Sequence, residues 1–160
     1  MITDAKAAIM HAEEQELLKP VTVSEEDKQA FFSKKRRSAI GMFFGSLALL
    51  AAAVLIALLL IYVAHVIIFS IRIVIGLFLV LCFPIYSIVN IFSVNSAISK
   101  GDYGFYTGTV VGRTEKGYRI RGLEQGDIDF ETDPKPDLLE GNPVVVARLK
   151  DEISLIPYKG

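Results

Sequence analysis

The stretch that decides the architecture of this chain runs from Ser38 to Ser93 and reads SAIGMFFGSLALLAAAVLIALLLIYVAHVIIFSIRIVIGLFLVLCFPIYSIVNIFS, with Arg72 as its only formal charge. A single helix over these 56 residues would be about 84 Å long, whereas the hydrocarbon core of a bilayer is about 30 Å thick. One straight crossing is therefore excluded. The stretch predicts two crossings, at residues 39–64 and 73–96.

The composition of the 160 residues agrees with this division. Hydrophobic residues make up 52% of the chain and charged residues 22%, which is apolar for a soluble domain of this size. Residues 1–38 carry seven basic and seven acidic side chains, and residues 94–160 carry nine and eleven. Neither flank is basic enough to indicate nucleic acid as the partner. The single cysteine, Cys82, can build neither a disulfide framework nor a cysteine-based zinc site.

Three regions follow from these patterns. We expect a cytoplasmic, charged helical arm at residues 1–38, a two-helix transmembrane hairpin at 39–98 and a cytoplasmic small β-barrel domain at 101–160. In the arm, residues 4–18 are good helix formers, and a second helix begins after Ser24, whose hydroxyl can cap it. The predicted fold class is an α-helical membrane hairpin plus an all-β, five-stranded barrel of the OB or SH3-like kind.

Four adjacent cations, Lys34, Lys35, Arg36 and Arg37, stand directly before the first crossing. Basic residues flanking a crossing are retained in the cytoplasm, and a second crossing returns the chain to the same side. The sequence therefore predicts a multi-pass protein of the plasma (inner) membrane with both termini cytoplasmic. We favour plain anchoring for the cluster over specific recognition of anionic leaflet lipids, although each cation gains about 1 kcal/mol near such a surface.

Small residues recur along one face of the first crossing, at Gly41, Gly45, Ala48 and Ala52. Small side chains allow close approach of a second helix, and the two glycines form a GxxxG pair. We expect this stripe to pack against the second crossing of the same chain, with homo-oligomer formation as the alternative.

Two ionisable residues, His65 and Arg72, lie between the crossings. They can reach headgroups or water at the far interface, and the alternative is a proton or ion path through the membrane. In the second crossing, Pro84 predicts a kink because it lacks a backbone donor.

After a flexible exit at Ser99–Gly104, the pattern changes to short strands, predicted at residues 105–113, 118–123, 127–132, 143–149 and 153–158. The second and third strands carry a matching alternation of charge. A three-residue loop would place Arg119 opposite Glu131 and Arg121 opposite Asp129 on the exposed face. We expect these four residues to form a surface ladder. A calcium loop is less suitable, because the glycine and glutamate that such a loop requires are missing.

The barrel region resembles the C-terminal barrel of the NfeD-like family. The resemblance is carried by the Gly117-Tyr118-Arg119-Ile120-Arg121-Gly122 hairpin, by the segment Glu140-Gly141-Asn142-Pro143-Val144-Val145-Val146 and by a last apolar strand ending at Pro157. It covers about a third of the chain. Members of that family carry the barrel behind membrane helices and serve as partners of stomatin- and flotillin-like membrane scaffold proteins. The resemblance therefore implies partners of that class.

The residues give no catalytic set. Both histidines and the cysteine lie outside the barrel, and the chain has no glycine-rich phosphate loop and no HExxH motif. We therefore expect no enzymatic activity, no cofactor and no metal. The predicted function is a membrane-anchored adaptor that presents its barrel to another protein. The alternative is an accessory subunit of a channel or transporter that acts through its transmembrane helices.

Overall fold

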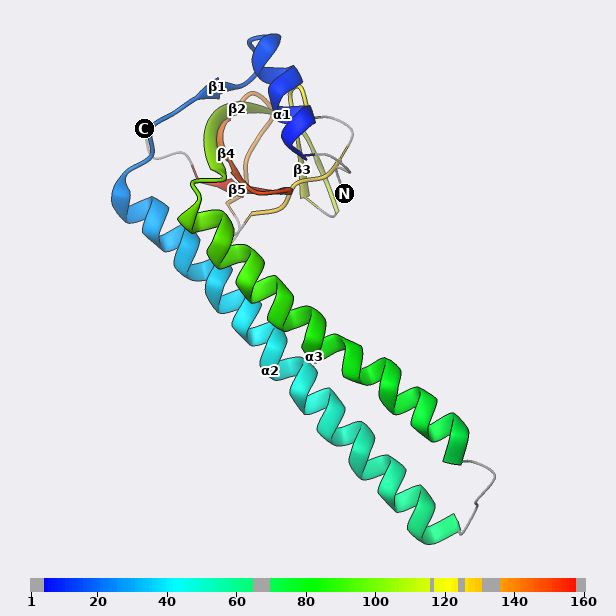
Figure 1. Cartoon of the computed structure of the whole chain (residues 1–160). Coiled ribbons are helices and arrows are strands. Elements are labelled where there is room, and N and C mark those ends of the chain that lie inside the picture. The colour runs from blue at the N-terminus through cyan, green and yellow to red at the C-terminus, as the bar shows by residue number, and fades with distance from the viewer. Residues whose placement is uncertain (1–4, 65–69, 116, 124–125, 131–135, 158–160) are drawn as a thin grey trace. The chain divides into compact units, whose positions relative to one another are not determined.

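The structure is a computed structural model that describes residues 5–64, 70–115, 117–123, 126–130 and 136–157. Figure 1 shows the helices α1 (Ala5–Glu14), α2 (Glu25–Ala64) and α3 (Ser70–Ser99), and the strands β1 (Lys19–Pro20), β2 (Tyr103–Thr114), β3 (Gly117–Ile120), β4 (Pro143–Leu149) and β5 (Glu152–Ile156). The chain forms two compact units. The sheet unit comprises Met1–Phe32 and Ala97–Gly160, and the helical unit comprises Ser33–Ser96.

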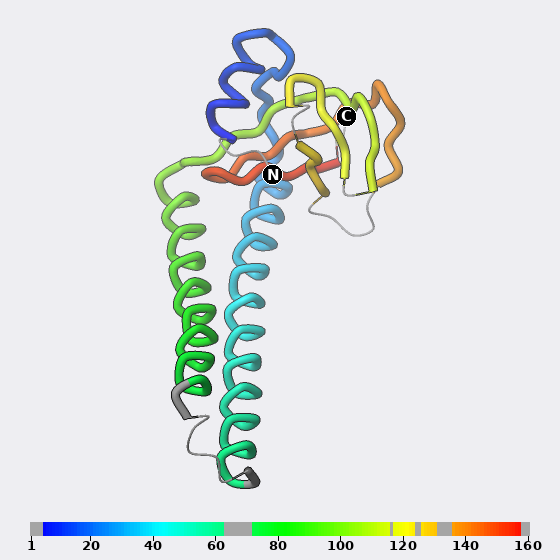
Figure 2. The backbone as a smooth tube through the Cα atoms, turned by 90° about the vertical axis from the view of Figure 1, so that its right-hand side faces the viewer, coloured from blue at the N-terminus to red at the C-terminus, as the bar shows by residue number. Residues whose placement is uncertain are grey.

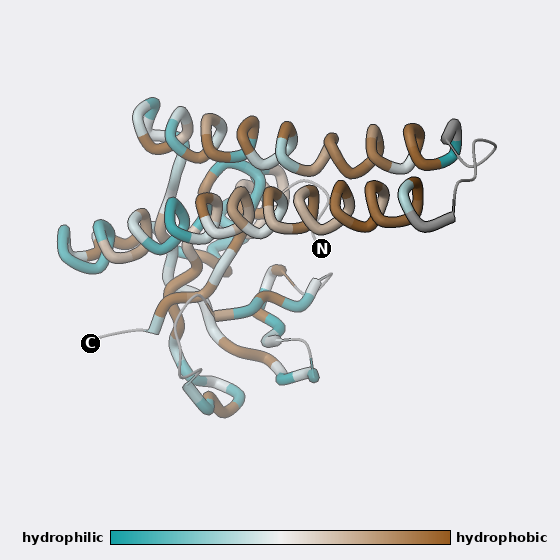
Figure 3. Tube along the Cα trace, turned by 90° about the horizontal axis from the view of Figure 1, so that it is seen from below, coloured by the Kyte–Doolittle hydropathy of each residue, from teal (hydrophilic) through white to brown (hydrophobic). Residues whose placement is uncertain are grey.

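In the helical unit, α2 and α3 run side by side in opposite directions (Figures 1 and 2). Both helices are long and apolar enough to cross a membrane, and Figure 3 shows hydrophobic residues over most of their length. Only 6% and 11% of their most apolar windows are buried, whereas the core helix of a soluble protein is mostly buried. The predicted crossings therefore correspond to two helices with apolar, exposed outer faces.

Between Ala39 and Tyr62, the residues of α2 that are not exposed lie on a single stripe with alternating steps of four and three. This stripe comprises Ala39, Phe43, Ser46, Leu50, Ala53 and Ala57. The corresponding stripe on α3 comprises Leu77, Val80, Pro84, Ser87, Ile91 and Val94. Steps of four and three give the 3.5-residue repeat of helices that pack along a left-handed seam. We call these two stripes the seam.

The small-residue stripe predicted to pack against the second crossing lies elsewhere. Gly41, Gly45, Ala48 and Ala52 are all exposed, and a Cβ atom added at either glycine would meet nothing within 4 Å. Each residue of this stripe follows a seam residue by two positions, which is a rotation of about 200° around the helix. The prediction had the correct spacing but the wrong face of α2. The segment 65–69, which includes His65, lies outside the described residues.

The sheet unit contains a five-stranded antiparallel sheet in which β2 is the long central strand. The order is β1-β2-β4-β5, and β3 pairs with the second half of β2. The pairing of β2 with β4 ends at Thr109, and its pairing with β3 begins at Val110. Within the β2–β3 pairing the register shifts between Val110 and Gly112. The strand predicted at 143–149 is confirmed by β4, while β1 was not predicted.

The sheet is not closed into a barrel, which corrects the predicted fold class. Among the described residues, the strand expected at 127–132 is reduced to isolated bridges from Ile128 to Tyr118 and from Phe130 to Leu155. Two single bridges do not make a ladder. Within residues 126–130, the gap between β3 and β5 is therefore spanned at two points.

The predicted register of the charged ladder is also wrong. Tyr118 and Ile128 exchange both backbone hydrogen bonds at 2.9 Å, which places Arg119 opposite Asp127. The Arg119 Nε to Asp127 Oδ1 distance is 3.3 Å. The shift has a local cause, because Gly122 adopts a φ of +83° and the Leu123 N–H donates to the Ile120 carbonyl. This is the turn that a glycine at its third position favours, and it ends the strand before Arg121. Glu131 lies outside the described residues.

The N-terminal arm is part of the sheet unit, which corrects the predicted domain division. Ile9, Ala12 and Leu18 are each 1% exposed and belong to the same core cluster as Val146 and Leu155. A Cβ atom on Gly108 would lie 2.9 Å from Leu18 Cδ2, so the absence of a side chain at Gly108 admits Leu18. One hydrophobic core is thus built from segments on either side of the helical hairpin.

Candidate interaction surface

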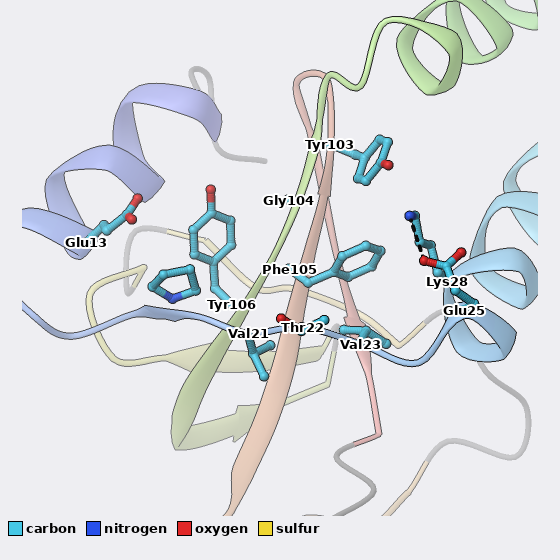
Figure 4. A pocket seen from close by; sticks show the side chains of 11 residues that line it. Glu13, Val21, Thr22, Val23, Glu25, Lys28, Tyr103, Gly104, Phe105 and Tyr106 are labelled. Atoms are coloured by element: carbon cyan, nitrogen blue, oxygen red, sulfur yellow. Dashed lines mark hydrogen bonds and ion pairs between the residues drawn. The ribbon is translucent and has the colours of Figure 1, made fainter.

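The sheet unit carries a groove of about 350 Å³ where the arm crosses β2 (Figure 4). Its walls come from the end of α1, the linker that follows β1, the first turn of α2 and the first residues of β2. The lining residues are Glu13, Pro20, Val21, Thr22, Val23, Glu25, Lys28, Tyr103, Gly104, Phe105 and Tyr106. The groove therefore depends on the packing of the arm against the sheet.

Aromatic contacts fix the relation of the first turns of α2 to β2. The rings of Phe31 and Phe105 meet edge to face with their centroids 5.9 Å apart, and those of Phe32 and Tyr103 do so at 4.9 Å. Edge-to-face pairs at these separations are favourable because the positive edge of one ring meets the negative face of the other. One side of the groove is therefore held by packed aromatic rings.

Ser24 determines where α2 begins. The Asp27 N–H donates to Ser24 Oγ at 3.1 Å, and this hydroxyl donates to Asp27 Oδ2 at 2.7 Å. The capping predicted from the sequence is confirmed. It orients the first turn so that Glu25 and Lys28 line the groove.

The exit from α3 is ordered, whereas the sequence predicted a flexible segment. Asp102 N–H donates to the Ala97 carbonyl and Gly101 N–H to the Ile98 carbonyl, with φ of +70° at Gly101. This pair of bonds is the Schellman motif, which commonly ends a helix at a glycine. The chain therefore turns sharply into β2, and Tyr103 is placed in the groove wall.

A partly buried ion pair stabilises this exit. Arg148 Nη1 donates to Asp102 Oδ1 at 2.9 Å and to the Lys150 carbonyl at 2.8 Å. The Arg148 side chain is 9% exposed and that of Asp102 is 40% exposed. The hydrogen bond from the Arg148 guanidinium lowers the pKa of Asp102 below its usual value, against an opposing effect of burial.

Gly104 has a steric role in the groove. A Cβ atom at this position would lie 2.8 Å from Tyr106 Cε2 and 2.8 Å from its hydroxyl oxygen. The Tyr106 ring thus lies over Gly104, which has no side chain to obstruct it. In Figure 4 the Tyr106 side chain lies between Glu13 and Gly104.

The charges of the groove are unevenly paired. Lys28 Nζ lies 3.1 Å from Glu25 Oε1 and 5.3 Å from the centroid of the Tyr103 ring. Glu13 has no ion pair or hydrogen bond from its side chain among the described residues. Glu13 and Tyr106 lie at one end of the groove, and Lys28 and Glu25 lie at the other (Figure 4).

The residues singled out from the sequence lie outside this groove. Within α2, Lys34 and Lys35 are half-buried, and Arg36 and Arg37 are exposed. Arg72 is exposed near the start of α3.

The predicted surface ladder is brought together only in part. Arg119 pairs with an acidic residue other than the one expected, while Arg121 is exposed. Asp129 accepts a hydrogen bond from the Phe130 N–H at 2.8 Å. The structure therefore does not support a ladder of two pairs.

Sequence reasoning missed the groove because it treated residues 99–104 as a linker. One signal was available in the alternation of Tyr103 and Phe105, which matches an aromatic pair in the arm, Phe31 and Phe32. Such alternation indicates that a strand has already begun. The partner strand for β2, Lys19–Pro20, contains a proline and is two residues long, which is too short for an alternating pattern to predict it.

Within the described part of the chain, no group of three or more histidine, cysteine, aspartate or glutamate side chains is arranged to hold a metal ion. Comparisons with models of protein families, with curated proteins and with solved structures find no match.

Proposed function

We propose that this protein is a non-enzymatic, membrane-anchored adaptor. Its two long helices cross the plasma (inner) membrane as a hairpin, and its sheet unit binds another protein at the cytoplasmic surface. The observation that carries this proposal is that one folded unit is assembled from the segments on either side of an apolar hairpin. In this arrangement two crossings anchor a compact domain at the membrane, and such a role requires no catalytic site.

The exposed faces of α2 and α3 support membrane insertion. Large apolar side chains, such as Phe44, Leu55 and Phe78, are 65%, 67% and 67% exposed. Contiguous apolar surface of this extent is unfavourable in water and favourable in lipid. The hydroxyls of Ser46 and Ser87 donate to carbonyls in their own helices, so neither needs water.

The shared core supports a topology in which the segments before and after the hairpin lie on the same side of the membrane. Residues of the arm, including Leu18, pack against β2 and β4 in one core. Two segments separated by the hairpin can do this only if they emerge on the same face of the bilayer. Lys34 to Arg37 favour the cytoplasmic face, because basic flanks are retained there.

The partner class is proposed from the resemblance to the NfeD-like family, which implies stomatin- or flotillin-like membrane scaffold proteins. Such partners would meet the sheet unit at the membrane surface. The cationic cluster at Lys34, Lys35, Arg36 and Arg37 would anchor the chain next to the anionic leaflet and so keep the unit there.

The topology is tested by labelling single cysteines in spheroplasts. Cys82 is first replaced by serine, and a cysteine is then placed at Ser70 or at Lys116. An impermeant maleimide is expected to label the first in intact spheroplasts and the second only after lysis. Labelling at position 116 in intact spheroplasts would overturn the orientation.

The adaptor function is tested by capture of bound proteins in mild detergent. Ile120→Asp disrupts the core of the sheet unit, while Arg72→Ala changes only the helical unit. Partners are expected to be lost with the first variant and retained with the second. Loss with Arg72→Ala alone would instead favour an accessory subunit that acts through its helices.

A further inference from the structure

We propose that the groove receives an arginine side chain from an extended segment of the partner protein, an inference that rests on the adaptor function proposed above. The occupant is argued from the charges that the groove leaves unpaired and from the shape of its aromatic end.

Charge complementarity favours a cation. Lys28 already lies 3.1 Å from Glu25 and also contacts the face of the Tyr103 ring. The charges of Lys28 and Glu25 therefore offset each other. The carboxylate of Glu13 remains, and the groove as a whole carries two acids against one base. An anionic headgroup would be repelled by the unpaired acid and would find the lysine occupied, whereas a cation gains an ion pair.

The end of the groove that contains Glu13 also contains Tyr106 (Figure 4). The Tyr106 ring is half-buried, and its hydroxyl has no hydrogen bond within the part of the chain that the structure describes. A guanidinium group can stack on an aromatic ring and bind a carboxylate with two parallel hydrogen bonds. A lysine ammonium is a compact point charge without this planar geometry. The combination of ring and carboxylate therefore selects arginine.

The remainder of the groove suits the neighbours of that arginine in an extended chain. Val21, Val23 and Phe105 supply an apolar surface between its two ends. Glu13, Thr22 and Glu25 are exposed, so the groove is open along its length. An open groove admits a strand-like segment with aliphatic side chains beside the arginine.

The test uses the full-length chain in nanodiscs of zwitterionic phosphatidylcholine. The probe is a fluorescent, N-acetylated pentapeptide with arginine between valines, compared with the same peptide carrying neutral citrulline. Fluorescence anisotropy is expected to give about tenfold tighter binding for the arginine peptide, as expected for one charge-assisted contact. Equal binding of the two peptides would overturn the inference.

Glu13→Gln is expected to bring the two peptides to within about twofold of each other. Glu14→Gln is the matched control, because Glu14 is the next residue of α1, is exposed and does not line the groove. It is expected to preserve the preference. An equal loss in both variants would show that binding depends on the general charge of α1 and would overturn the groove as the site.

This result is separable from the adaptor function. If Glu13→Gln retains every partner that the wild-type chain captures, the adaptor function stands and the arginine site is wrong. If the peptide preference depends on Glu13 but capture never depends on the sheet unit, the adaptor function is wrong and the arginine site stands.

Discussion

At the scale of single residues, two helix ends show how backbone conformation constrains side-chain identity. Both α1 and α3 end in a Schellman motif, with Glu16 and Gly101 in the left-handed position at φ of +57° and +70°. In α1, the Leu17 N–H donates to the Ala12 carbonyl at 2.9 Å, and the Glu16 N–H donates to the Glu13 carbonyl at 3.0 Å. Glycine is the residue that suits this conformation, so α1 uses a less suitable one.

Glu16→Gly is therefore expected to stabilise the sheet unit by about 0.5–1 kcal/mol. Gly101→Ala, the reciprocal change at the end of α3, is expected to destabilise it by about 1 kcal/mol. Thermal unfolding of the full-length chain in detergent, followed by circular dichroism, measures both. The same sign of change in the two variants would contradict the assignment of the motif.

The Asp102–Arg148 pair gives a second prediction at this scale. Because the pKa of Asp102 is lowered in the folded state, its stabilising effect is complete above the unfolded pKa of about 4 and is lost as the pH falls below it. Asp102→Asn should cost about 1–2 kcal/mol at pH 7, after allowing for solvent screening. The difference from wild type should shrink below about pH 4.

Asp127→Asn is the control for this measurement. Its partner Arg119 is 55% exposed, so the variant is expected to cost less than about 1 kcal/mol. Denaturant titrations at pH 3.5, 5 and 7 compare the two variants. A constant difference between Asp102→Asn and wild type over this range would contradict the role given to the ion pair.

At the scale of elements, α2 presents two stripes with the same alternation of four and three residues, and only one of them forms the seam. Ser46 is 8% exposed, whereas its neighbour Gly45 has open space around it. The sequence could not decide between the two faces. Both stripes have alternating steps of four and three and both contain small residues, and periodicity alone defines spacing rather than orientation.

Neighbouring substitutions distinguish the two stripes. Ser46→Leu is expected to destabilise the hairpin by about 1–3 kcal/mol, because it overfills a packed contact. Gly45→Leu is expected to stay within about 0.5 kcal/mol, since its side chain points away from α3. Unfolding in detergent micelles with increasing dodecyl sulfate provides the comparison. Equal costs would refute the seam, and a change of oligomeric state with Gly45→Leu alone would support the homo-oligomer alternative.

Elements with strong local patterns were predictable from the sequence. The two apolar runs gave α2 and α3, the Ser24 cap gave the start of α2, and the run Pro143–Leu149 gave β4. The sequence did not reveal that the sheet stays open, because the predicted strand at 127–132 depends on partners on both sides. Among its described residues, 127–130, only Ile128 and Phe130 form bridges. The groove also depends on tertiary contacts, since the arm and β2 are distant in sequence.

At the scale of the whole molecule, the arm completes the core of the sheet unit. Leu18 is 1% exposed, while Met10 on the same arm is 54% exposed. Leu18→Asp is expected to destabilise the unit by at least about 3 kcal/mol, because it places a charge in an apolar core. Met10→Asp should remain within about 0.5 kcal/mol. Limited proteolysis of the full-length chain distinguishes the two variants, and equal resistance would contradict the shared core.

Truncation of the chain also tests whether the arm is needed to complete the core of the sheet unit. A fragment of residues 101–160 lacks Ile9, Ala12 and Leu18 and is expected to melt without a cooperative transition. A fusion of residues 1–32 to residues 97–160 through a flexible glycine-serine linker restores these residues and is expected to melt cooperatively. Cooperative unfolding of the shorter fragment would show that the arm is dispensable.

The contact between Leu18 and Gly108 also sets an order of events during biosynthesis. The two residues are separated by 90 positions, which corresponds to roughly 5–20 s of translation at ordinary rates. During that interval the arm has left the ribosome without the strands that cover its apolar residues. In the proposed topology, a chain that inserts only one crossing leaves the arm and β2 on opposite sides of the bilayer. The apolar side chains of such a chain stay uncovered, so proteases and chaperones can distinguish it from a chain whose hairpin has been inserted.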